Sequence, residues 1–153
     1  MRKKGRINST HVFYDNIEFK SIFEFDVYKF LVENGLCPKY EPQTFVLWHG
    51  GKTVTPFYNA KTKHLRHYKA DLDDISYTPD FVFEYEGKQV FVEAKGFEND
   101  SFPIRKKMFR KYLDENIENA LFFEVRSILQ LNDMIEILRY GKLNNNKKKR
   151  KKP

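Results

Sequence analysis

The stretch that most constrains the fold of this chain is a pair of strand-like runs within residues 77–95. Glu86-Gly87, at their junction, fits a two-residue hairpin turn because glycine readily adopts positive φ. With this turn, Asp80 lies directly opposite Glu93, and opposed side chains point to the same face. Lys95 follows Glu93 by two residues and therefore shares that face. The hairpin therefore predicts that two carboxylates and an ammonium lie close together on one face of the sheet.

This trio of charges has two interpretations. Opposed like charges are unfavourable in a sheet, and a divalent cation such as Mg²⁺, which prefers carboxylate oxygens, would resolve the repulsion. A neighbouring lysine can then hold or deprotonate an attacking water, or stabilise charge on a phosphate. The alternative is a solvated outer face on which Asp80 merely ends a turn begun at Pro79. The opposite face is apolar, and we expect it to be core: Phe81, Phe83, Tyr85, Val90, Val92 and Ala94.

Hydrophobic periodicity predicts further elements on both sides of the hairpin. Helices are expected at 21–34, 101–113 and 131–140, and strands at 44–49, 77–85, 88–95 and 120–127. Gly50-Gly51 indicates a turn, and residues 52–75 form either a hairpin turning near 59–61 or a long irregular insert. This order predicts an α/β domain in which helices flank a central mixed sheet.

The same patterns predict which helix and strand side chains are buried. The helix at 21–34 has one apolar stripe, made by Phe23, Val27, Phe30 and Leu31. The helix at 101–113 has another, made by Ile104, Met108, Phe109 and Tyr112. Trp48, Tyr58 and Tyr68 are expected in the core or covering it.

Charge is concentrated at the two ends of the chain. A length of 153 residues favours one domain, expected at 11–143 between a basic N-terminal arm (1–10) and a basic disordered tail (144–153). Ten of the 28 basic residues lie in these ends, which hold no acid, so the domain itself is mildly acidic. Basic ends attract polyanions, although the tail also fits a solubilising or localisation segment.

Cysteine content and hydropathy indicate in which cellular compartment the protein is expected. A single cysteine, Cys37, excludes an internal disulfide and predicts a reduced thiol. The sequence holds neither an apolar run long enough to span a membrane nor the pattern of a secretory signal. We therefore expect a cytoplasmic protein.

The spacing of these residues resembles the PD-(D/E)XK nuclease signature, with Pro79-Asp80 followed by Glu93-Ala94-Lys95. The upstream segment 21–41 resembles the opening helix of the phage endonuclease I type Holliday-junction resolvases. The matching positions are Ser21, Glu24, Val27, Leu31, Gly35, Tyr40 and Glu41. The same layout is similar to small phage proteins and to transposon-end nucleases. The resemblance covers residues 20–113, except the insert at 50–75.

The resemblance implies a restriction-endonuclease-like core and Mg²⁺-dependent hydrolysis of DNA phosphodiesters, with Mn²⁺ able to substitute. Asp80, Glu93, Glu24 and the main-chain carbonyl of Ala94 would hold the metal, and Lys95 would position or activate the water. The implied substrate is branched DNA such as a Holliday junction, cut by a homodimer because a junction needs two paired cuts. Nicked, linear or transposon-end DNA, or nucleic-acid binding without catalysis, are alternatives.

Two assignments stay open in the sequence. Ser21-x-x-Glu24 is also a capping box, in which Glu24 would bond the Ser21 amide, and Glu18 competes for the metal role. The helix at 101–113 carries five bases and no acid, so it either contacts DNA phosphates or is an ordinary solvated face. Those bases are Arg105, Lys106, Lys107, Arg110 and Lys111. The insert is also basic and is a second candidate for DNA contact.

Overall fold

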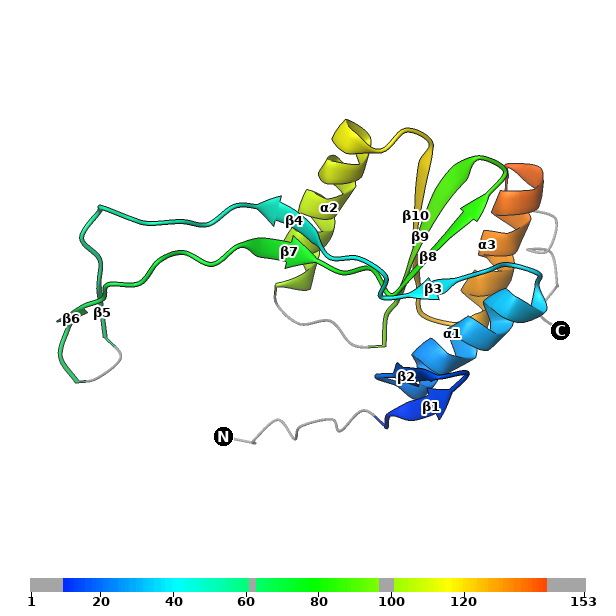
Figure 1. Cartoon of the computed structure of the whole chain (residues 1–153), viewed down its shortest axis with the longest axis horizontal. Helices are drawn as coiled ribbons and strands as arrows, with labels where there is room; N and C mark the ends of the chain where they lie inside the picture. Colours follow the sequence, from blue (N-terminus) through cyan, green and yellow to red (C-terminus); the bar gives the residue numbers. More distant parts are fainter. Residues whose placement is uncertain (1–9, 61–62, 97–100, 143–153) are drawn as a thin grey trace, which may run out of the picture.

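A computed structural model shows a four-stranded sheet with helices on both faces (Figure 1). It describes residues 10–60, 63–96 and 101–142, so the predicted tail and nearly all of the predicted N-terminal arm lie outside the described residues. The sheet has the order β10-β9-β8-β3, with bounds Ala120–Val125, Lys88–Ala94, Phe81–Tyr85 and Lys39–Tyr40. β10 runs parallel to β9 and the other neighbours are antiparallel, which confirms a mixed sheet in an α/β domain.

Helices bury both faces of this sheet, whereas the sequence predicted a core on one face of the hairpin. α1 (Ile22–Glu33) and α3 (Ile128–Tyr140) pack on the expected face, around Val90 and Val92. α2 (Phe102–Asn116) packs its Phe109 against Phe91 on the face that carries Glu93. The reason is topological, because the crossover between parallel strands β9 and β10 carries α2 over that second face.

The helix ends follow their caps. The Ser21 hydroxyl accepts the Glu24 amide at 3.2 Å, so α1 begins where predicted. α3 begins a turn earlier than predicted because Ser127 caps it, and it ends at Gly141, whose φ is 70°. On α2, Ile104 is 63% exposed, so its predicted place in the core is wrong.

The predicted strand at 77–85 is two strands in two sheets. β7 (Ile75–Tyr77) pairs with β4 (Phe45–Trp48), and the main sheet resumes only with β8. Pro79 lies between them and has no amide to donate to a ladder. Tyr77 therefore reaches the hairpin's charged face from a neighbouring sheet.

Residues 49–60 and 63–74 form the described part of a long two-stranded arm that projects from the body (Figure 1). β4 and β7 form its base, an isolated bridge joins Gly51 to Leu72, and β5 (Tyr58–Asn59) pairs with β6 (Arg66–His67) near its tip. Of the two alternatives for this insert, the structure shows the hairpin, but Asn59, expected in the turn, belongs to β5, and much of the arm between its short strands is irregular. The predicted turn at Gly50-Gly51 is wrong. A Cβ at Gly50 would lie 1.8 Å from the Leu72 carbonyl oxygen, so a glycine is needed here because the two segments of the arm lie very close together.

An N-terminal hairpin was not predicted. β1 (Val12–Tyr14) and β2 (Ile17–Phe19) are joined by Asp15 and Asn16, whose φ angles of 54° and 59° suit a type I′ turn. The hairpin places Phe19, which is fully buried, in the core beside α1.

Candidate active site

The candidate site lies where β8 begins and β9 ends. The predicted register is confirmed, since Phe81 pairs with Val92 and Tyr85 with Lys88. Asp80 directly precedes β8, and its Oδ2 accepts the Ala94 amide at 2.7 Å. The turn geometry thus brings Asp80 beside the strand end that carries Glu93.

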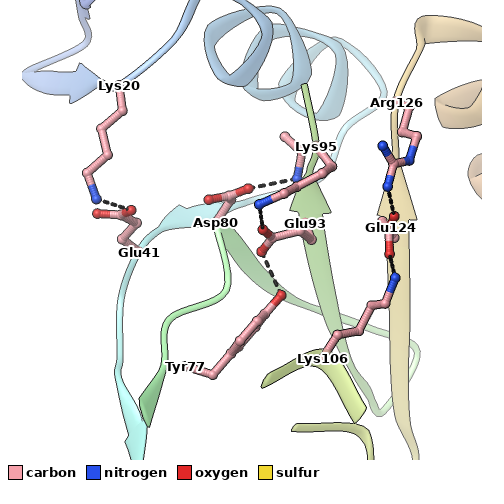
Figure 2. Close-up of polar contacts among 10 residues, drawn as sticks. Lys20, Glu41, Tyr77, Asp80, Glu93, Lys95, Lys106, Glu124 and Arg126 are labelled. Carbon is pink, nitrogen blue, oxygen red and sulfur yellow. Dashed lines mark hydrogen bonds and ion pairs between the residues drawn. The ribbon is translucent and has the colours of Figure 1, made fainter. Parts of the chain in front are cut away.

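Glu93 is a buried carboxylate with two partners, as Figure 2 shows. The Tyr77 hydroxyl donates to Oε2 at 2.7 Å, and the Lys95 Nζ lies 3.4 Å from Oε1. The Lys95 ammonium also lies 3.8 Å from the ring centroid of Phe102, at the start of α2. Asp80, Glu93 and Lys95 therefore meet on one face, as the hairpin predicted, but that face is largely closed to solvent.

Burial of this acidic pair perturbs its protonation. Burial, followed by the charge of Glu93, raises the pKa of Asp80 to about 8, although the Ala94 amide opposes the shift. Burial also raises the pKa of Glu93 and outweighs its hydrogen bonds from Tyr77 and Lys95. Burial raises the pKa of the Tyr77 hydroxyl as well, so this group stays a hydrogen-bond donor. A bound cation would favour both ionised carboxylates.

Glu24 lies near this pair, and its negative charge contributes to the raised pKa of Asp80. Its Oε2 accepts the Tyr40 hydroxyl at 2.6 Å and the Lys20 amide at 3.0 Å. The capping-box prediction is met in part: Ser21 caps the helix, but the Glu24 carboxylate reaches the amide one residue earlier than expected. Glu24 thus both closes the start of α1 and adds charge beside Asp80.

Glu18, the competing candidate, lies elsewhere. It is on β2, where its carboxylate pairs with the exposed His11 at 2.9 Å. The structure therefore assigns Glu18 to the N-terminal hairpin.

Sequence reasoning missed a second lysine–glutamate pair beside Asp80. The Lys20 ammonium bonds the Glu41 carboxylate, and the Glu41 amide donates to the Asp80 carbonyl at 2.8 Å. The hydrogen bond to Glu41 raises the pKa of Lys20, and the charges of Glu24 and Asp80 add to this effect. In Figure 2, Asp80 lies between this pair and the Glu93–Lys95 pair. Glu41 was one of the positions that matched the resolvases, but the resemblance implied no role for it. No local sequence pattern singled out Lys20 or Tyr77.

The five bases of α2 have different environments. Lys106 is half-buried and pairs with Glu124 of β10 at 2.5 Å, which Arg126 also contacts at 2.6 Å. Lys111 lies 3.5 Å from Glu115 within α2, and both are exposed. The other three are exposed: Arg105, Lys107 and Arg110. A role in holding α2 against the sheet thus accounts for Lys106 without DNA.

The comparisons with known proteins leave the site to be interpreted from its geometry. No protein-family model matches the chain, and no similar curated protein or solved structure was found. Within residues 10–60, 63–96 and 101–142, no helix is long and apolar enough to cross a membrane.

The donor set at the site fits a hard cation. In the described part of the chain, no three His, Cys, Asp or Glu side chains are grouped closely enough to hold a metal by themselves. Mg²⁺, however, usually takes only one or two carboxylates, with waters and substrate phosphates completing its shell. The half-buried Asp80 and the buried Glu93 both have raised pKa values, and these two carboxylates meet that requirement.

Proposed function

We propose that this protein is a metal-dependent DNA endonuclease with a restriction-endonuclease-like core of the PD-(D/E)XK type. The observation that carries the proposal is the pair formed by the half-buried Asp80 and the buried Glu93 beside the Lys95 ammonium. Burying like charges together is costly for stability, and neutral side chains would fill the same space without that cost. Chemistry that needs these charges accounts for their presence.

The cation would be held by Asp80, Glu93 and the Ala94 carbonyl, while Glu24, whose carboxylate accepts the Tyr40 hydroxyl and the Lys20 amide, would add negative charge beside it. When bound, Mg²⁺ or Mn²⁺ supplies charge stabilisation at the phosphate oxygens and lowers the pKa of bound water. Tyr77 holds Glu93 in place through its hydrogen bond, and the Ala94 amide does the same for Asp80.

Lys95 supplies the remaining group that hydrolysis needs. Its ammonium can donate to the attacking water or to a non-bridging phosphate oxygen. The water oxygen forms the new bond to phosphorus and releases a proton to solvent, the bond to the leaving sugar oxygen breaks, and that oxygen takes up a proton from solvent. Arg105, Lys107 and Arg110 on the exposed side of α2 are suited to hold the neighbouring phosphates.

Branched DNA, such as a four-way junction, is the proposed substrate. Resolving a junction requires two paired cuts, and a homodimer supplies two sites in the simplest way. The basic charge of the chain, +7 overall, suits a polyanionic partner. A nuclease acting on nicked, linear or transposon-end DNA is the second candidate.

Cleavage assays with matched variants test this proposal. The protein is incubated with Mg²⁺ and with four-way, nicked and linear DNAs of the same sequence, beside Asp80→Asn and Lys95→Ala. Glu84→Gln is the matched control, because Glu84 is an exposed carboxylate at the other end of the same hairpin. We expect junction cleavage by the wild type and Glu84→Gln alone. Cleavage that survives both site substitutions refutes the site, and equal cleavage of all DNAs refutes junction selectivity.

A further inference from the structure

The arm at residues 49–74 has the shape of a two-stranded ribbon with little support from the body (Figure 1). Its backbone pairing continues past the base: Gly51 and Leu72 exchange two hydrogen bonds of 2.8 Å, and the Tyr68 amide donates to the Phe57 carbonyl at 2.8 Å. At about 3.3 Å per extended residue, the segment from Trp48 to Asn59 can span at most about 35 Å, since it bends at Thr55. The arm can therefore reach at most about one turn of B-DNA beyond the body.

The distal part of the arm carries charge of one sign. The sequence contains no Asp or Glu between Glu41 and Asp71. The basic side chains described there are all exposed: Lys52, Lys63, Arg66 and Lys69. The acids of the arm lie toward its base, where the Asp74 carboxylate accepts the Gly50 amide at 2.8 Å. The tip and middle are consequently a cationic surface on a mildly acidic domain.

Exposed rings lie among these charges, although Trp48, Tyr58 and Tyr68 were expected to be core or cover. Their side chains are 43%, 59% and 41% exposed. Phe57 is 56% exposed, and the Tyr58 and His67 rings lie 5.1 Å apart across the strands. Rings interleaved with bases present apolar contact together with positive charge, a combination that suits nucleic acid.

The arm is directly connected to the candidate site. Its returning strand ends in β7, whose last residue, Tyr77, donates the hydrogen bond to Glu93. Tyr77 also stacks on Phe109 of α2, with ring centroids 4.4 Å apart. The base of the arm is thus held against the helix and carboxylate of the site, so DNA bound along the arm is positioned relative to that site.

We propose that this arm is a DNA-binding ribbon that enters the groove of the duplex flanking the cleavage point. A two-stranded ribbon fits the major groove, where lysines and arginine reach phosphates and rings contact sugars and thymine methyl groups. The inference rests on the proposed function in one respect, namely that the bound duplex is the substrate of the Asp80–Glu93 site.

Charge favours DNA over a second copy of the chain as the occupant. Two of these arms laid together would bring their acid-free surfaces into contact, and like charges across an interface are unfavourable. A phosphate backbone neutralises the same charges and releases counterions.

Binding without catalysis tests the proposal separately from the nuclease assignment. The arm variant changes Lys52, Lys63, Arg66 and Lys69 to glutamine, and the control variant changes four exposed lysines elsewhere: Lys29, Lys39, Lys88 and Lys142. Affinity for duplexes with flanks longer or shorter than one helical turn (about 10 base pairs) is measured in EDTA across salt. Sedimentation of each variant gives its oligomeric state.

We expect the arm variant to bind the long-flank duplex at least about tenfold more weakly near 0.15 M salt, with a salt slope reduced by about 2 to 3. The short-flank duplex and the control variant should show little change. Equal losses in both variants, or wild-type affinity of the arm variant, overturn the proposal. Conversion of a dimer to a monomer with unchanged affinity per protomer also overturns it, because the arm is then a protein interface. EDTA suppresses cleavage, so these outcomes do not depend on whether the nuclease proposal holds.

Discussion

Replacing Asp80 with asparagine should remove DNA cleavage and at the same time stabilise the metal-free protein at alkaline pH. The Asp80 carboxyl has its pKa raised from 3.8 to about 8 by burial and by Glu93. Because an acid with a raised pKa binds its proton more tightly in the native state, the free energy of unfolding falls as pH rises between these values. The fall is up to about 1.4 kcal/mol per pH unit, or up to about 4 kcal/mol between pH 5 and pH 8.

The Asp80→Asn substitution removes the charge but keeps the hydrogen bond, because the asparagine amide oxygen can still accept the Ala94 amide. Urea unfolding in EDTA at pH 5, 6, 7 and 8 gives the free energy of unfolding of both proteins. The variant should lose less stability than the wild type over this range, and its advantage should be largest near pH 8. Glu84→Gln, which changes an exposed carboxylate, should follow the wild-type curve.

Repeating the unfolding experiment with Mg²⁺ in place of EDTA tests the same role of Asp80. Mg²⁺ should stabilise the wild type at pH 8, where it compensates the ionised pair, and should have little effect on Asp80→Asn. A variant that is less stable than the wild type at every pH, or that parallels the wild-type pH dependence, would refute the view that Asp80 is a partly desolvated charge kept for function.

Four further substitutions separate catalytic from structural roles. Lys95→Ala should lower kcat by at least about 100-fold while circular dichroism shows an unchanged fold. Tyr77→Phe removes a hydrogen bond that lowers the pKa of Glu93, so the rising limb of the pH–activity profile should move to higher pH; an unmoved limb contradicts this. Lys106→Ala should cost about 1–3 kcal/mol in urea unfolding, because it leaves Glu124 with fewer partners. Lys107→Ala should leave stability unchanged and weaken DNA binding; equal effects of the two lysine substitutions would contradict the distinction.

The elements that local pattern specifies were predicted well. The β8–β9 register follows from a period of two and from Gly87, whose φ is 74°. α1 and α3 follow from apolar periodicity and serine caps, although the cap at Ser127 was overlooked. The N-terminal hairpin was missed because Asp15-Asn16 is a weaker turn signal than a pair that contains glycine.

Predictions were wrong where contacts between segments far apart in the sequence determine the structure. The sequence could not show that Pro79 separates two sheets, because β7 finds its partner in β4, about 30 residues earlier. Nor could it show that aromatic residues of the insert are exposed, since an apolar side chain predicts burial only where another element covers it. Ile104 was misplaced for the same reason.

The sequence by itself determined that Asp80, Glu93 and Lys95 share one face, because alternation along a strand and a two-residue turn are local properties of the backbone. Tertiary structure alone decided that this face is buried beneath α2, that Tyr77 and the Lys20–Glu41 pair converge on it, and that the insert extends away from the body. Desolvation by the surrounding elements makes this local pattern chemically significant: the same two carboxylates in water would titrate normally, whereas partly removed from water their ionised forms require a counterion.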